Sequence, residues 1–162
     1  MKITTPGRIC LFGEHQDYLG LPVIALAISL RSTIKAVRRN DRKIIINMPD
    51  VNQVEEFSLD NLSYTKDRDY FKSAIRVCQK EGLNYKNGFD STIQSNIPIQ
   101  AGTSSSSSIV VGWIKLISSL ADNPPSWDNQ TIGKLAYEAE VLEFDEPGGM
   151  MDQFSTPLAG CI

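Results

Sequence analysis

The stretch Ile97–Leu120 reads IPIQAGTSSSSSIVVGWIKLISSL and decides the fold of this 162-residue chain. A proline, a small-residue turn at Ala101-Gly102 and five consecutive serines, Ser104 to Ser108, lead into an apolar run too long for a strand. That order predicts a glycine- and serine-rich loop that opens a helix. Because the run is apolar on nearly every side, we expect this helix to be the most buried and its first turn to be held firmly.

The start of such a helix presents unpaired backbone N–H groups and the positive end of the helix dipole. Serine hydroxyls can bond phosphate oxygens or ligate magnesium, and Gly102 lets the backbone approach a ligand closely. The loop is not a Walker A motif, because no lysine follows the glycine in the required pattern. The sequence therefore predicts an anion site of another phosphate-binding class, with a flexible serine-rich linker as the alternative.

The composition, with 41% hydrophobic and 22% charged residues, is that of a single soluble domain. A net charge of −3 favours neither nucleic acid nor an anionic membrane as a partner. Three cysteines without C-x-x-C spacing indicate neither a disulfide framework nor a zinc site. The early apolar run 19–30 contains Pro22 and is too short to span a bilayer, so we expect a cytoplasmic location.

Hydrophobic patterns predict a mixed, largely antiparallel sheet with helices on its faces, an α+β fold. A turn at Asn40-Asp41 is expected to join two of its strands as a hairpin. The expected sheet segments are an extended stretch at 2–12, the segment 11–30 with a strand at 23–30, and strands at 33–38, 43–48 and 89–97. The expected helices are 69–80, 104–121 and 129–143.

Two further segments carry polar side chains that the residues alone do not explain. The turn GEHQDYLG holds Glu14, His15, Asp17 and Tyr18 between two glycines, a composition that a surface turn can also have. A lone histidine is more often a structural hydrogen-bonding residue than a catalyst. Asp152 follows a double glycine in PGGMMDQF and could be an ordinary turn or cap residue.

Three separated segments nevertheless resemble, in order and approximate spacing, the galactokinase branch of the GHMP kinases. They are PGRICLFGEHQDY at 6–18, PIQAGTSSSSS at 98–108, and AE at 139–140 followed by PGGMMDQ at 147–153. That superfamily groups galactokinase, homoserine kinase, mevalonate kinase and phosphomevalonate kinase. The resemblance implies its N-terminal domain fold, which is like domain 2 of ribosomal protein S5. It also implies transfer of the γ-phosphoryl of ATP to a monosaccharide hydroxyl, at the anomeric position.

The resemblance also assigns roles by position. Arg8 and Asp152 match the catalytic pair, and Ser106 with Glu140 match the magnesium ligands. The positions that match sugar-binding residues are Glu14, His15, Asp17, Tyr18 and Gly149. Those that match the ATP-binding loop are Gly102, Thr103, Ser104, Ser105, Ser106 and Ser107. Helical periodicity alone favours Glu143 as the inward-facing carboxylate, whereas the spacing of twelve from Glu140 to Asp152 fits the family.

The chain departs from the galactokinase pattern in residues and in length. Galactokinases usually have Asn at Cys10, Gly at Gln100, Leu at Thr103 and Ala at Ser107, which bears on the sugar more than on the reaction. The family also has a C-terminal half with a third glycine-rich motif, so residues 1–162 are expected to form the N-terminal domain and to need that half as a partner. The alternatives are an inactive sugar-sensing protein and a kinase for a non-sugar alcohol such as mevalonate.

Overall fold

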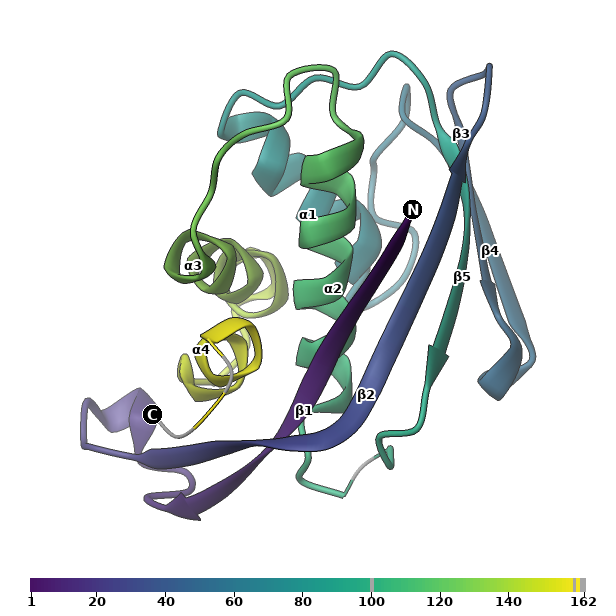
Figure 1. Ribbon diagram of the computed structural model, residues 1–162. Helices are drawn as coiled ribbons and strands as arrows, with labels where there is room; N and C mark the ends of the chain where they lie inside the picture. Colours follow the sequence, from purple (N-terminus) through teal and green to yellow (C-terminus); the bar gives the residue numbers. More distant parts are fainter. Residues whose placement is uncertain (100, 159, 161–162) are drawn as a thin grey trace.

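A computed structural model describes residues 1–99, 101–158 and 160, and it consists of one mixed sheet with a layer of helices (Figure 1). The departure at Gln100 and the end residues Ala159, Cys161 and Ile162 lie outside this description. The strands are β1 (Lys2–Phe12), β2 (Ile24–Arg38), β3 (Lys43–Met48), β4 (Gln53–Ser58) and β5 (Phe89–Ser95). The helices are α1 (Tyr70–Lys80), α2 (Ser105–Leu120), α3 (Asn129–Glu140) and α4 (Met151–Leu158), with short 3-10 helices at Asp17–Leu19, Pro49–Val51 and Leu142–Phe144. The expected α+β architecture is confirmed.

The sheet order is β1-β2-β5-β3-β4, and the expected hairpin between β2 and β3 is wrong. β5 lies between these strands, antiparallel to β2 and parallel to β3. Gly88 explains how it enters there, because a Cβ at this position would collide with the backbone of Lys43. Its carbonyl accepts from Arg39 N at 2.9 Å and its N–H donates to Asp41 O at 2.7 Å. The Asn40-Asp41 turn therefore connects two strands that lie on either side of β5, and these strands do not pair with each other as a hairpin.

Other element boundaries also differ from expectation. The segments 23–30 and 33–38 form one strand, β2, and a turn over residues 13–23 separates it from β1, so 11–30 is not a single sheet segment. The sequence does not predict β4, because most of its side chains are polar and none is buried at this edge of the sheet. α4 was missed because it contains Pro157, and α3 ends at Glu140 before a short 3-10 turn.

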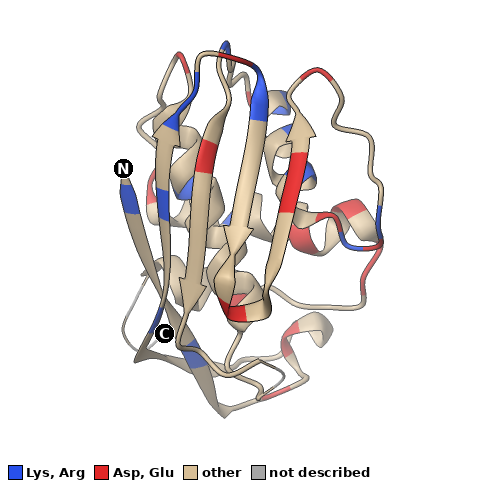
Figure 2. Cartoon of the chain, turned by 90° about the vertical axis from the view of Figure 1, so that its right-hand side faces the viewer, with Lys and Arg blue, Asp and Glu red and all other residues tan. Residues whose placement is uncertain are grey.

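All four helices cover the same face of the sheet (Figure 1). Figure 2 shows positions of charged residues scattered along the strands of the sheet. α2 crosses the centre of the covered face, and most of its residues are buried, as expected. Its Trp113 is fully buried against the rings of Phe71 and Phe89.

The first turn of α2 is tied to β1. Thr5 Oγ1 donates to Ser108 O at 2.8 Å, and Ser108 Oγ donates to Thr5 O at 3.2 Å. Both residues are almost completely buried. The serine loop therefore starts a helix whose position is fixed, and the flexible-linker alternative is excluded. None of the helices in the described part of the chain has the length and apolar character that a membrane crossing requires.

Candidate active site

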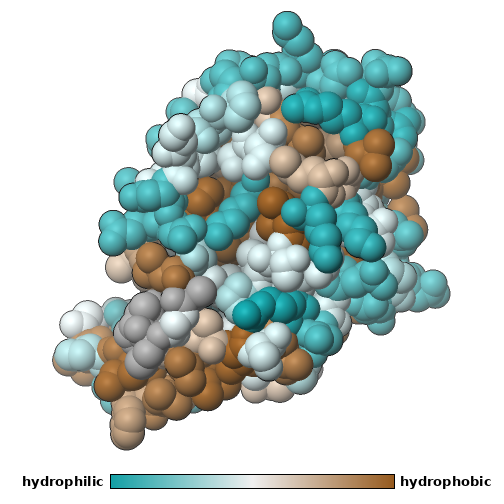
Figure 3. Space-filling model, viewed as in Figure 1, coloured by the Kyte–Doolittle hydropathy of each residue, from teal (hydrophilic) through white to brown (hydrophobic). Residues whose placement is uncertain are grey.

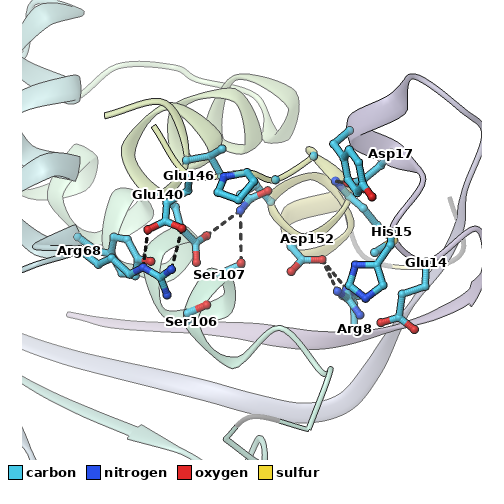
Figure 4. Close-up of a pocket in the computed structure, with 18 residues that line it drawn as sticks. Arg8, Glu14, His15, Asp17, Arg68, Ser106, Ser107, Glu140, Glu146 and Asp152 are labelled. Carbon is cyan, nitrogen blue, oxygen red and sulfur yellow. Dashed lines mark hydrogen bonds and ion pairs between the residues drawn. The ribbon is translucent and has the colours of Figure 1, made fainter. Parts of the chain in front are cut away.

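A pocket of about 310 Å³ lies where α2, α3 and α4 approach the β1–β2 turn (Figure 4). Most of the predicted site residues line it, although they come from segments far apart in the sequence. They are Arg8, Glu14, His15, Asp17, Tyr18, Ser106, Ser107, Glu140, Gly149 and Asp152. The other predicted loop residues, Gly102, Thr103, Ser104 and Ser105, line an adjoining hollow that also includes Ser106.

At the centre of the pocket Arg8 contacts Asp152, which lies in the first turn of α4. Arg8 Nε donates to Asp152 Oδ1 at 2.7 Å, and Nη2 donates to the same oxygen. The third nitrogen, Nη1, donates to Gly102 O at 2.7 Å. Arg8 is only 5% exposed, so its guanidinium is a fixed bridge between the carboxylate and the serine loop.

The serine loop enters α2 in a conformation that leaves its polar groups available. Ser104 has a φ of 55° and Gly102 a φ of 64°, so two residues of the loop adopt the left-handed region. Arg8 N donates to Thr103 O at 3.2 Å, which holds the loop against β1. Ser104 Oγ is buried and has no hydrogen-bond partner among the residues that the structure describes. Since the first N–H groups of a helix also have no intrahelical acceptor, this end of α2 suits an anion.

Glu140 lies at the end of α3 and is only 6% exposed. Burial raises the pKa of its carboxyl, and hydrogen bonds from Gln153, Ser106 and Ser107 oppose that shift. Gln153 Nε2 donates to Glu140 Oε2 at 2.7 Å and to Ser107 Oγ at 3.4 Å. Ser107, where galactokinases usually have Ala, therefore takes part in this network.

Glu140 lines the pocket, whereas Glu143 does not. Glu143 accepts from Tyr64 OH at 2.5 Å and pairs with Lys80, outside the pocket. Among the described residues no group of three or more His, Cys, Asp or Glu side chains could hold a metal ion. A magnesium ion needs only one or two protein oxygens when phosphates supply others, and the Glu140 carboxylate with the Ser106 hydroxyl meets that need.

The polar turn before β2 contacts the segment before α4. Met151 N donates to Asp17 Oδ2 at 3.0 Å, and a Cβ at Gly149 would collide with the same carboxylate. His15 has a φ of 60° and lines the pocket beside Arg8 (Figure 4). Tyr18 also lines the pocket, and it is 57% exposed. The structure thus brings together the two segments that the resemblance assigns to the sugar.

Sequence reasoning assigned no role to eight lining residues, and four of them have polar side chains: Arg68, Tyr70, Glu146 and Gln153. Gln153 could have been found, because it follows Asp152 directly in a motif that was already singled out. Arg68 and Glu146 carry no such signal, since their ion pair joins a loop before α1 to a loop before α4. A smaller, largely apolar hollow adjoins the pocket at Ser106, with a lining that includes Phe71, Ile109 and Val110.

Comparison with known proteins gives matches over nearly the whole chain. Residues 69–160 match the GHMP kinases N terminal domain, and residues 2–39 match the galactokinase galactose-binding signature. The galactokinase of Clostridium beijerinckii is 33% identical over 156 residues, which cover 93% of this chain and 40% of that protein. The mevalonate kinase of Methanocaldococcus jannaschii is 34% identical over 146 residues, which cover 86% of this chain and 46% of that protein. The chain thus spans less than half the length of these relatives.

Solved structures of the same two kinds of kinase resemble the fold. A crystal structure of Methanococcus jannaschii mevalonate kinase has a TM-score of 0.86 at 32% identity, covering 99% of this chain and 52% of that one. A crystal structure of Lactococcus lactis galactokinase complexed with galactose has a TM-score of 0.85 at 28% identity, covering 95% of this chain and 40% of that one. Both similarities extend over the sheet and the helices that form the pocket.

Proposed function

The chain belongs to the GHMP kinase family, and on that premise we propose that it forms the N-terminal domain of an ATP-dependent kinase that phosphorylates a monosaccharide. The observation that carries the proposal is the Arg8–Asp152 pair. This pair lies between a helix start suited to phosphate and a polar turn suited to a sugar. The Asp152 carboxylate is therefore near both the expected donor and the expected acceptor of the phosphoryl group. Because ATP is held inside cells, the reaction would take place in the cytoplasm.

The nucleotide would bind at the start of α2. Backbone N–H groups of the serine loop and the unpartnered Ser104 hydroxyl would hold phosphate oxygens. Ser106 and Glu140 would hold a magnesium ion, which offsets phosphate charge when bound. The apolar hollow beside Ser106 offers Phe71, Ile109 and Val110 to the base and ribose.

The reaction requires a hydroxyl placed in line with the γ-phosphoryl group, and positioning is the main source of catalysis. Asp152 would accept the hydroxyl proton as the oxygen attacks. Arg8, which donates to Asp152 Oδ1 at 2.7 Å, would hold that carboxylate in place and would offset negative charge on the transferred group. Glu14, His15 and Asp17 would hold the other hydroxyls of the sugar. The close approach of Gly149 to Asp17 would fix the distance between the bound sugar and Asp152.

A second candidate is a kinase for a non-sugar alcohol, which the similarity to mevalonate kinase supports. The acceptor turn favours the sugar, because Glu14, His15 and Asp17 offer several hydrogen-bonding groups to a molecule with many hydroxyls. The match of residues 2–39 to the galactose-binding signature supports the same choice. An inactive sugar-sensing protein is a third candidate, and the retained Arg8, Glu140 and Asp152 argue against it.

A chimaera tests the proposal. The residues of the C. beijerinckii galactokinase that align with this chain are replaced with residues 1–162, and ADP release is measured with galactose, other monosaccharides and mevalonate. We expect release that depends on a monosaccharide. A folded chimaera that responds only to mevalonate would favour the second candidate, and one that binds sugar without release would favour the sensing protein. The 162-residue chain alone should turn over slowly or not at all, because its relatives are more than twice as long.

A further inference from the structure

One ion pair in the lining of the pocket joins two loops and has no role in the proposed reaction. Arg68 Nε donates to Glu146 Oε1 at 2.5 Å, and Nη2 donates to Oε2 at 2.7 Å. Arg68 lies in the turn before α1, whereas Glu146 precedes the Pro147-Gly148-Gly149 segment. The Arg68 side chain is 60% exposed and that of Glu146 is 26% exposed. Because water reaches this ion pair, it contributes little to stability and can exchange for another partner.

The backbone at Arg68 is fixed even though its side chain is exposed. Its φ is 55°, an unusual value for a residue other than glycine. The next residue, Asp69, is 1% exposed and pairs with buried Lys72 at 3.0 Å. Lys72 Nζ also donates to Thr65 Oγ1 at 2.7 Å, and Thr65 N donates to Asp69 Oδ2 at 3.2 Å. This network, in which Asp69 and Lys72 are buried, anchors the loop and holds the backbone of Arg68 in one place beside the pocket.

That place is the junction of two hollows. Arg68, Tyr70 and Ser106 are the residues that line both the polar pocket and the adjoining apolar hollow. A ligand with a charged end at Ser106 and an apolar end against Ile109 would therefore pass beside the guanidinium. The other arginine that lines the polar pocket, Arg8, is already engaged by Asp152 and Gly102. Arg68 is the arginine that is available at the Ser106 end (Figure 4).

We infer that Arg68 binds the phosphates of the nucleotide and that Glu146 is its resting partner, which competes with the nucleotide for the guanidinium. The inference rests on the proposed nucleotide site. A polyphosphate carries more charge than one carboxylate and offers the same fork of oxygens, so it displaces Glu146. Glu146 then separates from Arg68, and it belongs to the segment that leads to Gly149 and its contact with Asp17. Nucleotide binding would thereby change the position of the segment that contacts Asp17 on the acceptor side of the pocket.

If Glu146 competes with the nucleotide, removing its charge should tighten nucleotide binding. If the ion pair is merely structural, the same change should weaken binding or leave it unchanged. The 162-residue chain is titrated with magnesium and ADP, and binding is followed through the NMR amide shifts of Ser105, Ser106 and Ser107. Arg68→Gln should weaken binding by ~5- to 30-fold, the range for losing a charge-assisted contact. Glu146→Gln should tighten binding by ~2- to 5-fold, because the competitor is gone. The double variant should bind like Arg68→Gln, since Glu146 acts only through Arg68.

Another arginine with a two-pronged carboxylate contact provides the control. Arg39 Nε and Nη2 donate to Asp41 Oδ1 and Oδ2, both at 2.8 Å, and neither residue lines the pocket. Arg39→Gln and Asp41→Asn should leave ADP binding unchanged. Unchanged or weaker binding by Glu146→Gln would overturn the inference while leaving the nucleotide site intact. If wild type shows no shifts at the start of α2, the proposed function fails there, and this inference fails with it.

Discussion

Arg8 and Asp152 lie 144 positions apart in the chain, and Arg8 Nε donates to Asp152 Oδ1 at 2.7 Å. Arg8 also donates to Gly102 O at 2.7 Å, so a single buried guanidinium joins β1, the serine loop and α4. Either role of Asp152 that the sequence left open, turn residue or proton acceptor, fits its place in a first helical turn. The buried arginine is what favours the second.

Asp152→Asn separates these roles. In the galactokinase chimaera, Asn keeps the shape and most of the hydrogen bonding but removes the base and the ion pair. Turnover should fall by ~10²–10⁴-fold, with sugar and ATP binding changed only a few-fold. A helix-start residue would instead change stability by less than ~1 kcal/mol and leave turnover intact. Turnover and melting temperature measured on the same variant decide between them.

Glu140→Gln should stabilise the chain, and more so at high pH. Burial raises the pKa of this carboxyl in the folded chain, so the unfolded chain loses the proton at a lower pH. The protonated Glu140 carboxyl therefore contributes stability that is fully present below the unfolded pKa. This contribution is lost as the pH rises through the folded pKa. The melting temperature of Glu140→Gln should exceed that of wild type by more at about pH 8 than at about pH 5. A variant that is less stable than wild type at both values would contradict this account.

Gly149→Ala tests the contact between the acceptor turn and the segment before α4. A Cβ at this position would collide with the Asp17 carboxylate, so this side chain must move away and lose its contact with Met151 N. We expect a loss of about 1–3 kcal/mol in the free energy of unfolding and weaker sugar binding. Gly148→Ala is the matched control, because a Cβ there meets only Val141 methyl groups at 3.7 Å, an ordinary contact. Equal effects at the two glycines would show that the Asp17 contact has no special role.

The end of the molecule that holds the turn between β1 and β2 should cause weak self-association. Several large apolar side chains are exposed there, and Figure 3 shows apolar surface gathered at the lower end of the molecule. They are Leu11, Phe12, Leu19, Leu21 and Ile24. Replacing Phe12 and Leu19 with serine should lower the association seen by sedimentation velocity. Val37→Ser and Val54→Ser, at isolated exposed positions on β2 and β4, should not.

The sequence predicted the parts of the fold that repeat a local pattern. α2 has an apolar character that is hard to mistake, and β5 alternates buried and exposed side chains along its length. The partners of β5 could not be predicted, because a strand with two neighbours has the same periodicity as a strand with one. The same limit hid α4, where Pro157 interrupts the helical signal although the surrounding structure accommodates it.

The candidate site divides in the same way. Arg8, Glu140 and Asp152 were assigned by a resemblance of short motifs, and the fold places all three in one pocket. Periodicity alone favoured Glu143, but the chain leaves the regular helix at Val141, and Glu143 then turns toward Lys80. Arg68 and Glu146 could not be found, because each is an ordinary charged residue until the fold brings their loops together.

The central claim is that one pocket holds a sugar on the Asp17 side of Asp152 and a nucleotide on the serine-loop side. NMR titration of the 162-residue chain with galactose, and separately with magnesium and ATP, tests it most directly. Galactose should shift the amides of the 14–18 turn, Gly149 and Met151, whereas ATP should shift those of Ser104 to Ser107. Galactose shifts confined to residues outside the pocket, or shifts at the 14–18 turn caused by mevalonate but by neither galactose nor another monosaccharide in parallel titrations, would contradict the account.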